Sequence, residues 1–477
     1  MITDLEPYPA MKDSGVPWLG EVPEHWRVLP NRAVFTEVNE RGRAEADMLS
    51  VTITRGVIRQ QVLLEDSSKK DGSNRDKSAY KLVRPGDIAY NKMRAWQGAL
   101  GVSEYEGIVS PAYVVQRPRE GAIPRYLHYL LRTPGFAKEA ERWSYGITSD
   151  MWSLRPEHFK MIYSCLPAES EQAAIVRFLD YTDRRIRRYI RAKQKLIALL
   201  KEQKQAIIHR AVTRGLDPNV RLKPSGVEWL GDVPEHWEVA ALRHRYSQVL
   251  GKMLDAKRIT GESLLPYLRN TDVQWGRINV DRLPQMDIAP AEYERYTVRP
   301  GDLLVCEGGE VGRAAIWVGT LPLCGFQKAL HRLRPFNPDR DTPRFLYFTL
   351  RAAAISNAFS DGHVSTIAHL TGDKLRSHLF PFPPAEEQAS IAQWLDAALE
   401  KIDGANECTA RQINLLREYR TRLIADVVAG KLDVREAATR LPDEVEEAEA
   451  IGEVGDEGDA DEMRSGGDTE AGEEAEV

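Results

Sequence analysis

The residue types that most often carry catalysis or bind metals are scattered along this chain. Four cysteines, Cys165, Cys306, Cys324 and Cys408, lie far apart with no Cys-x-x-Cys pair, so their spacing predicts neither a zinc site nor a disulfide framework. The ten histidines show no ligand spacing. We find no Asn/Asp-Pro-Pro-Tyr/Phe motif, no phosphate-loop motif and no His-Glu-x-x-His motif. The sequence therefore predicts a chain with no catalytic centre and no metal site of its own.

Two stretches have compositions that could contact phosphate. The glycine-rich VCEGGEVGR at 305–313 does not follow the dinucleotide-binding fingerprint, which disfavours a nucleotide site there. The run DRRIRRYIRAKQK at 183–195 carries seven Arg and Lys residues. Such a run is usually a solvated helix face. The alternative is phosphate contact, because the guanidinium group matches phosphate geometry.

The charge of the chain is unevenly distributed. The net charge is −6, but residues 443–477 hold sixteen acidic residues against one basic residue, Arg464, which gives −15. The remaining 442 residues therefore carry −6 + 15 = +9, which permits binding to nucleic acid without requiring it. We expect the segment 434–477 to be an acidic disordered tail. It would act as a solubilising appendage, or alternatively as an electrostatic decoy for a basic groove.

Length and composition are those of a multidomain globular protein. A chain of 477 residues is too long for one core and suggests roughly three domains. The sequence has no signal-peptide pattern at its start and no run near the ~18 apolar residues of a membrane span. With unpaired cysteines as well, we expect a cytoplasmic protein.

Most of the chain is an internal duplication. SGVPWLGEVPEHW at 14–26 returns as SGVEWLGDVPEHW at 225–237, and VRPGD at 83–87 returns at 298–302. LPAESEQAAIVRFLD at 166–180 likewise matches FPPAEEQASIAQWLD at 382–396. The stretches between these landmarks have diverged. A duplicated frame with divergent loops implies one task performed on two different targets.

Each half combines a sheet region with a long helix. Short β-rich runs punctuated by Gly and Pro predict a mixed sheet with long loops. A heptad stripe then steps by four and three residues from Ile186 to Ala211, and again from Ile402 to Val427. We expect the first helix to run from about residue 170 to 213, with Gly215 and Gly430 ending the two helices. Neither helix can bury its stripe alone, so the favoured arrangement is an antiparallel pair that spaces two domains. The alternative is that each helix packs on its own domain.

These motifs together resemble those of a type I restriction–modification specificity subunit. The resemblance rests on the paired SGVxWLGxVPEHW openings, GDIAYNKMRAWQGALGVSEYEGIVSP, PYLRNTDVQWGRI, GDLLVCEGGEVGRAAIW and the PPAEEQASIAQWLD helix entries. It covers about residues 8 to 433. It implies a mixed α/β fold with a pseudo-two-fold internal repeat: target-recognition domains at 1–165 and 218–381, and spacer helices at 166–217 and 382–433 that form an antiparallel coiled coil.

The resemblance also implies the function. Each recognition domain would read one half of a bipartite DNA target in the major groove, and the helices would set the gap between the halves. The chain itself would be non-catalytic and without cofactors. It would bind double-stranded DNA, two methyltransferase subunits and restriction–translocase subunits, with S-adenosylmethionine, ATP and Mg²⁺ on those partners. The alternative is a related interaction scaffold that does not read DNA.

Base readout needs donors and acceptors on protruding elements. The candidates in the first half are Asn91, Lys92, Arg94 and Gln97 beside Trp96, with Ser144, Thr148 and Ser149. Those in the second half are Arg269, Asn270, Arg313, Gln327 and Lys328, with His363, Ser365 and Thr366. Half or more of these could instead be turn or frame residues. His25, His236 and the tryptophans Trp18, Trp26, Trp229 and Trp237 belong to the repeated frame and are expected to be structural.

Overall fold

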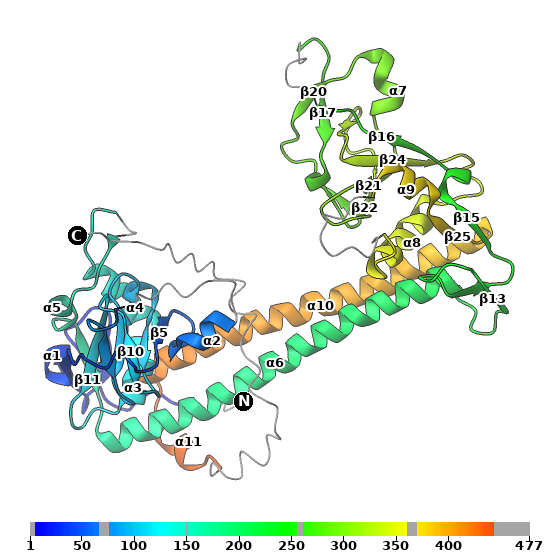
Figure 1. Ribbon diagram of the computed structural model, residues 1–477. Coiled ribbons are helices and arrows are strands. Elements are labelled where there is room, and N and C mark those ends of the chain that lie inside the picture. The colour runs from blue at the N-terminus through cyan, green and yellow to red at the C-terminus, as the bar shows by residue number, and fades with distance from the viewer. Residues whose placement is uncertain (1–4, 66–75, 149–150, 255–260, 360–369, 443–477) are drawn as a thin grey trace. The chain divides into compact units, whose positions relative to one another are not determined.

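The structure is a computed structural model that describes residues 5–65, 76–148, 151–254, 261–359 and 370–442 (Figure 1). Its contacts divide the chain into two compact units. Unit 1 comprises Met1–Ala192 and Gln412–Val477, and unit 2 comprises Lys193–Arg411. Each unit therefore contains the sheet region of one half of the duplicated sequence, together with parts of both long helices.

Unit 1 is built on a four-stranded antiparallel sheet in the order β4-β11-β8-β9. These strands are β4 (Phe35–Val38), β11 (Tyr113–Pro118), β8 (Ile88–Asn91) and β9 (Leu100–Val102). Strand pairs around it are β1 (Met11–Asp13) with β2 (Glu21–Pro23), β3 (Arg27–Pro30) with β12 (Tyr163–Leu166), β5 (Leu49–Thr52) with β6 (Gly56–Arg59), and β7 (Lys81–Val83) with β10 (Gly107–Val109). The short helices are α1 (Asn31–Val34), α2 (Gln60–Glu65), η1 (Ala95–Gln97), α3 (Pro124–Leu131), α4 (Pro134–Arg142) and α5 (Pro156–Phe159).

Unit 2 has a four-stranded sheet with the corresponding order β16-β24-β21-β22. These strands are β16 (Tyr246–Leu250), β24 (Leu330–Pro335), β21 (Leu303–Cys306) and β22 (Ala314–Ile316). The other strands are β13 (Leu222–Pro224) with β14 (Asp232–Pro234), β15 (Glu238–Ala241) with β25 (Leu379–Phe382), β18 (Val273–Gln274) with β19 (Arg277–Ile278), and the sheet β20 (Gln285–Asp287), β17 (Leu264–Leu268), β23 (Gly325–Phe326). The short helices are η3 (Leu242–His244), η5 (Asn270–Asp272), η6 (Pro290–Glu292), α7 (Tyr293–Tyr296), α8 (Pro343–Ile355) and α9 (Gly372–Ser377).

The central strands are apolar on both faces because both faces are covered. In β8, Ile88 and Tyr90 join the cluster that contains α3 and α4, whereas Ala89 between them joins the cluster formed by β5, β6, β7 and β10. In β21, Leu303 faces the cluster of α8 and Leu304 faces a second cluster. Successive side chains of a strand point to opposite faces, so a run without polar residues marks a strand buried on both sides.

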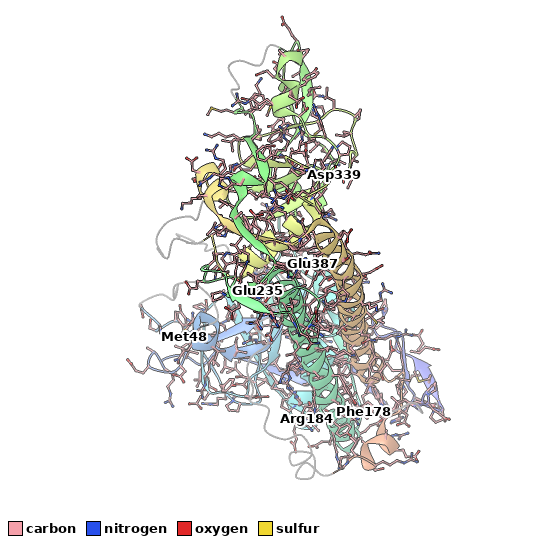
Figure 2. All side chains as sticks on the ribbon, turned by 90° about the vertical axis from the view of Figure 1, so that its right-hand side faces the viewer. Met48, Phe178, Arg184, Glu235, Asp339 and Glu387 are labelled. Carbon is pink, nitrogen blue, oxygen red and sulfur yellow. The ribbon has the colours of Figure 1, made fainter. Side chains whose placement is uncertain are left out.

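The two long helices are α6 (Glu169–Arg214) and α10 (Ala385–Val428). The sequence-based prediction of about 170–213 for the first helix is confirmed. Positions of the predicted stripe are buried or half-buried, among them Ile186 and Ile413, each at 6% exposed. Arg184, which Figure 2 labels on α6, is exposed, whereas the labelled Phe178 is buried. The stripe predicted from the sequence is therefore the face that each helix hides.

Each core uses the start of one long helix and the end of the other. Phe178 near the start of α6 and Val427 near the end of α10 lie in the main core of unit 1. Leu395 near the start of α10 and Ile208 near the end of α6 lie in the main core of unit 2. Burial of these apolar side chains holds the start of one long helix and the end of the other in each core.

The repeated motifs make repeated frame contacts. The side-chain amide of Gln172 donates to Pro167 O at 2.9 Å and its oxygen accepts from the amide of Ile123 at 2.8 Å. In unit 2, Gln388 binds Pro383 O and the amide of Thr342 in the same way, at 2.9 Å each. The glutamine of the repeated Glu-Gln motif therefore attaches α6 to the residue before α3 and α10 to the residue before α8.

The PGD and PEHW motifs also belong to this frame. Asp87 accepts two hydrogen bonds from Arg117, at 2.8 and 3.0 Å, and Asp302 accepts two from Arg334, at 2.7 Å each. Trp26 and Trp237 are 0% and 1% exposed. Trp18 and Trp229 are partly buried against the same cores. The structural roles predicted for these four tryptophans are confirmed.

The helix-ending glycines pack against the PEHW motifs. Gly215 has φ +73°, and a Cβ there would meet Trp237 at 3.3 Å. Gly430 has φ +75°, and a Cβ there would meet Pro23 at 2.2 Å and Trp26 at 3.1 Å. Glycine is needed because the backbone turns into the left-handed region where no side chain fits. The PEHW repeat therefore holds the C-terminal end of a long helix in each unit.

The predicted tail boundary at residue 434 is too early. Residues 435–439 form helix α11 (Arg435–Thr439), and Val434 and Ala438 are 0% and 2% exposed in the core of unit 1. These two apolar residues four positions apart lie on one helix face, which gives the segment enough apolar surface to stay packed. The acidic residues 443–477 lie outside the described residues.

Candidate nucleic-acid interface

The predicted readers of unit 1 come from two stretches that the fold brings together. Asn91 ends β8, and η1 contains Gln97. The Trp96 ring lies 5.6 Å from that of Trp152, edge to face, and the amide of Leu154 donates to Lys92 O at 2.9 Å. The loop that contains Thr148 is therefore packed beside the turn that contains Lys92, although the two are more than fifty residues apart.

Within this turn, some side chains hold the backbone and others face solvent. Asn91 accepts from the amide of Met93 at 3.0 Å, a contact that shapes the turn. Arg94 donates to Gln97 at 3.2 Å, and Gln97 is exposed. Thr148 is also exposed, whereas Ser149 lies outside the described residues. Lys92, Arg94, Gln97 and Thr148 remain candidates for readout.

Ser144 is a correction to the predicted set. It is 8% exposed, and its hydroxyl donates to Ala140 O of α4 at 2.7 Å. A buried hydroxyl with its hydrogen bond already made closes the end of a helix and cannot reach a base edge. Ser144 is a frame residue.

Unit 2 gathers its predicted readers around the end of β17. Arg313 donates to Asn270 O at 2.8 Å, and the amide of Gln327 donates to Leu268 O at 2.9 Å. Lys328 is exposed next to Gln327. These residues therefore form one local group, although they come from segments up to 58 residues apart. His363, Ser365 and Thr366 lie outside the described residues.

Arginines of this group already have partners. Arg269 binds Asp272 through two hydrogen bonds, at 2.9 and 2.8 Å, and these bonds raise the pKa of its guanidinium. The side chain of Arg313 is 14% exposed. Its partner Asn270 contributes a backbone oxygen, so the Asn270 amide group is not used in that bond. Arg313 therefore positions the group, Arg269 is held by Asp272, and Lys328 is an exposed donor beside the half-buried Gln327.

Arg132 is a positioning residue that the sequence analysis did not identify. Its guanidinium donates to Gly98 O at 3.2 Å and Leu100 O at 2.5 Å, and to Ile53 O and Thr54 O at 2.6 and 2.8 Å. It thereby ties the β5–β6 hairpin to the residues that follow the candidate turn. Burial, with smaller effects from neighbouring arginines, lowers the pKa of Arg132 to about 10. The sequence signal for Arg132 is its position in a repeated motif, since LLR at 130–132 corresponds to TLR at 349–351.

The described part of the chain shows neither a cluster of metal ligands nor a membrane-spanning helix. No group of three or more His, Cys, Asp or Glu residues there could hold a metal ion. Among its helices, none has the length and apolar composition needed to cross a bilayer.

Comparisons with known proteins agree with the fold. Residues 251–414 match the family model described as type I restriction modification DNA specificity domain. The chain is 23% identical over 436 residues to the putative type I restriction enzyme MjaX specificity subunit of Methanocaldococcus jannaschii, covering 87% of this chain and 96% of that one. It is 29% identical over 168 residues to the EcoBI specificity subunit of Escherichia coli, covering 35% of this chain and 33% of that one.

Solved structures share the fold over most of the chain. One, from work on complex assembly and conformational transition of the type I R-M system, has a TM-score of 0.67 at 18% identity and covers 86% of this chain and 99% of its own. The HsdS subunit of Thermoanaerobacter tengcongensis has a TM-score of 0.52 at 18% identity, with 86% and 98% covered. At 18% identity, these likenesses show a shared fold. The family model, the sequence relatives and these structural neighbours together indicate a type I restriction–modification specificity subunit.

Proposed function

We propose that each half of this chain reads one half of a bipartite DNA target in the major groove. The supporting observation is that the two units present different donors. The loop after β8 carries Lys92, Arg94 and Gln97, whereas unit 2 presents Gln327 and Lys328 directly after β23. Arg and Lys bind guanine edges, and Gln binds adenine edges. Different donors on one frame give two different half-sites.

The long helices set the gap between the half-sites as an antiparallel coiled coil. Within unit 1, Arg420 of α10 donates to Asp183 of α6, and within unit 2, Lys204 of α6 donates to Asp403 of α10. Asp183 near the start of α6 therefore pairs with a residue near the end of α10, and Lys204 further along α6 pairs with a residue nearer the start of α10. This order is the one expected of antiparallel helices. We keep the domain boundaries at 165, 217, 381 and 433, with helix α11 added after the last of them.

The chain recruits two methyltransferase subunits, and restriction–translocase subunits join them. It has no catalytic role, and S-adenosylmethionine, ATP and Mg²⁺ belong to the partners. Support comes from Leu199 of α6 and Leu415 of α10, which are 51% and 57% exposed and lie 216 positions apart, at equivalent places in the duplication. Two equivalent exposed leucines on helices suit two identical partners.

Mapping of DNA modification tests this function. The full chain is co-expressed with the methyltransferase encoded beside it, and modified adenines are located by long-read sequencing. We expect a split motif, two short defined halves around a fixed run of arbitrary bases. Exchanging residues 1–165 for those of a relative should change one half only. Absence of partner-dependent methylation, with both proteins soluble and associated, would favour the scaffold alternative, and a change in both halves would refute the two-reader model.

A further inference from the structure

Unit 1 contains an arginine-lined cavity that the readers described above do not use. It has a volume of about 690 Å³ and lies where the β5–β6 hairpin and α3 meet segments of α6 and α10. Six arginines line it: Arg55, Arg59, Arg125, Arg132, Arg187 and Arg420. The acidic residues of the lining are Glu104 and Asp183. With His128 uncharged, since burial holds its pKa well below the usual value, the described residues of the lining carry 6 − 2 = +4.

The acids of this lining are already shared among arginines. Asp183 accepts from Arg187 at 2.8 Å and also from Arg420. Burial opposes ionisation of Asp183, but Arg420 and Arg187 together keep its pKa below the usual value. Arg125 donates to Asp180, just outside the lining, at 3.1 and 3.0 Å, and lies 3.8 Å from Glu104. Arg132 has four backbone oxygens as its hydrogen-bond acceptors, and these carry no formal charge. With Asp180 counted as well, an excess of 6 − 3 = +3 remains in a partly enclosed space.

Several of these arginines are held in place by aromatic rings and backbone groups. The guanidinium of Arg59 lies 4.9 Å from the centre of the Tyr105 ring, and that of Arg125 lies 5.2 Å from the Tyr129 ring. Arg132 is fixed by its carbonyl partners. Guanidinium groups that are already ordered lose little conformational freedom on binding, and they bind phosphate oxygens through paired hydrogen bonds.

The equivalent place in unit 2 has the opposite balance of charge. Two adjoining cavities there share Lys204, Trp275, Arg351 and Asp403. Together they are lined by four basic and five acidic residues, 4 − 5 = −1. Arg351 corresponds to Arg132 in the duplication, but Asp403 stands where unit 1 has Arg187. Both units therefore have a cavity at this place. Among the described lining residues, that of unit 1 has an excess of positive charge, whereas the unit 2 cavities, taken together, have none.

We propose that the arginine cavity of unit 1 binds backbone phosphates of DNA. Unit 1 then contacts the duplex at a place separate from its base-reading residues. This inference rests on the proposed function, because it takes DNA as the source of the phosphate. A volume of about 690 Å³ admits a phosphate with its neighbouring sugars. Phosphate contacts fix register and orientation and carry no sequence information. The two half-sites should therefore differ in how strongly salt weakens their binding.

The test compares paired charge removals in the two units. The full chain, with its co-expressed methyltransferase, is titrated with a 30-bp fluorescent duplex over a range of NaCl concentrations. Arg59→Gln with Arg187→Gln removes two charges from the arginine cavity. Lys201→Gln with Arg351→Gln removes two charges from the unit 2 cavities and is the matched control. Arg59→Lys with Arg187→Lys keeps the charge and tests rescue.

We expect the first pair to weaken binding at least about tenfold and to reduce the salt slope by about two, since each phosphate contact contributes about 0.9 to that slope. The control pair should change affinity less than about twofold, and the lysine pair should restore most of the loss. Equal losses from both glutamine pairs, or no loss from the first, would overturn the proposal while leaving DNA reading intact. Wild-type protein that binds no duplex would instead overturn the proposed function.

A second arm distinguishes DNA from free phosphate compounds. Thermal unfolding is followed with sodium pyrophosphate and with ATP in the absence of DNA. We expect neither compound at 1 mM to stabilise the wild type more than the Arg59→Gln, Arg187→Gln variant. Stabilisation of the wild type alone, with unchanged DNA affinity in the variant, would assign the cavity to a free phosphate compound and overturn its assignment to DNA.

Discussion

The Nε2 atom of His25 lies 2.9 Å from a carboxylate oxygen of Glu171, and the duplicated pair His236 and Glu387 repeats this contact at 2.8 Å. The two pairs differ in what else the glutamate holds. Glu171 also accepts from Tyr8 at 2.7 Å and from the indole of Trp26 at 3.1 Å. Burial and the bond to Glu171 raise the pKa of the Tyr8 hydroxyl, which therefore stays protonated as a donor.

Replacing Glu171 should destabilise unit 1 more than replacing Glu387 destabilises unit 2. Glu171→Ala leaves the buried Tyr8 hydroxyl and Trp26 indole without an acceptor, at a cost of about 2–3 kcal/mol. Glu387→Ala removes a partly exposed pair and should cost less than about 1 kcal/mol. Calorimetry of the full chain should show a fall of several degrees for the first variant only. Equal shifts would contradict the difference in hydrogen bonding.

Replacement by alanine should have opposite effects on stability at two glycines, one within α10 and one just after it. Gly430→Ala forces a Cβ into the left-handed region and onto Pro23, which should cost at least about 1 kcal/mol. Gly404 lies within α10, and a Cβ there meets nothing within 4 Å. Gly404→Ala should therefore stabilise the helix by about 0.5–1 kcal/mol. Unfolding in urea measures both changes, and stabilisation by Gly430→Ala would refute the packing against the PEHW motif.

His378 should make the stability of unit 2 sensitive to acid. Its ring lies among aromatic rings, 5.0 Å from Phe359 and 4.8 Å from Phe380, and burial lowers its pKa to about 4. Because the unfolded imidazole has a pKa of about 6.5, it takes up a proton first, and the folded state loses stability as pH falls from about 6.5 to 4. The slope from this residue is at most about 1.4 kcal/mol per pH unit.

The matched variant is His378→Phe, which keeps an aromatic ring at the position. Thermal unfolding of both proteins between pH 7.5 and 4 should give a difference in midpoint that grows on acidification and is absent above pH 7. Parallel curves for the two proteins would mean that His378 does not titrate in this range.

We expect Leu199 and Leu415 each to contact one methyltransferase copy. Leu199→Glu or Leu415→Glu places a charge in one of the two proposed contact surfaces, and burial of an unpaired carboxylate is costly. Native mass spectrometry should find one methyltransferase copy fewer for either variant and none for the double variant. Val318→Glu, at a position 79% exposed in unit 2 and outside the long helices, is the control. Two bound copies in the double variant would exclude these surfaces.

Lengthening both helices should widen the gap in the target. Four residues inserted at equivalent places in α6 and α10 add about 6 Å of helix, which corresponds to about two base pairs. Methylation mapping should show the same two half-sites separated by a longer run of unread bases. Altered half-sites with an unchanged gap would refute the spacer role.

Much of the frame could be predicted from the sequence because its signals are local and occur twice. The stripe from Ile186 to Ala211, with a glycine after it, predicts the C-terminal part of α6, and the expected span of about 170–213 agrees with the structure to within a residue at each end. The repeated tryptophans predict buried anchors, and Trp26 and Trp237 are buried. Duplication makes such signals strong, since a motif that recurs in the same order marks the shared frame.

The site was less predictable, because a polar residue in a loop looks the same whether it faces solvent or closes a helix. Ser144 has the composition of a reader, yet its hydroxyl bonds Ala140 O inside the frame. Val434 and Ala438 follow a helical spacing that the acidic composition of the segment after them obscured.

The sequence by itself determined the duplication, the two long helices and the glycines and tryptophans that end and anchor them, since these depend on periodicity and residue type along the chain. Only the tertiary structure decided which charges meet. Arg132, Arg187 and Arg420 line one cavity although up to 288 positions separate them, whereas Asp403 takes the place of Arg187 in the other half. Electrostatic potential depends on distance in space, and strand pairing and helix packing set that distance.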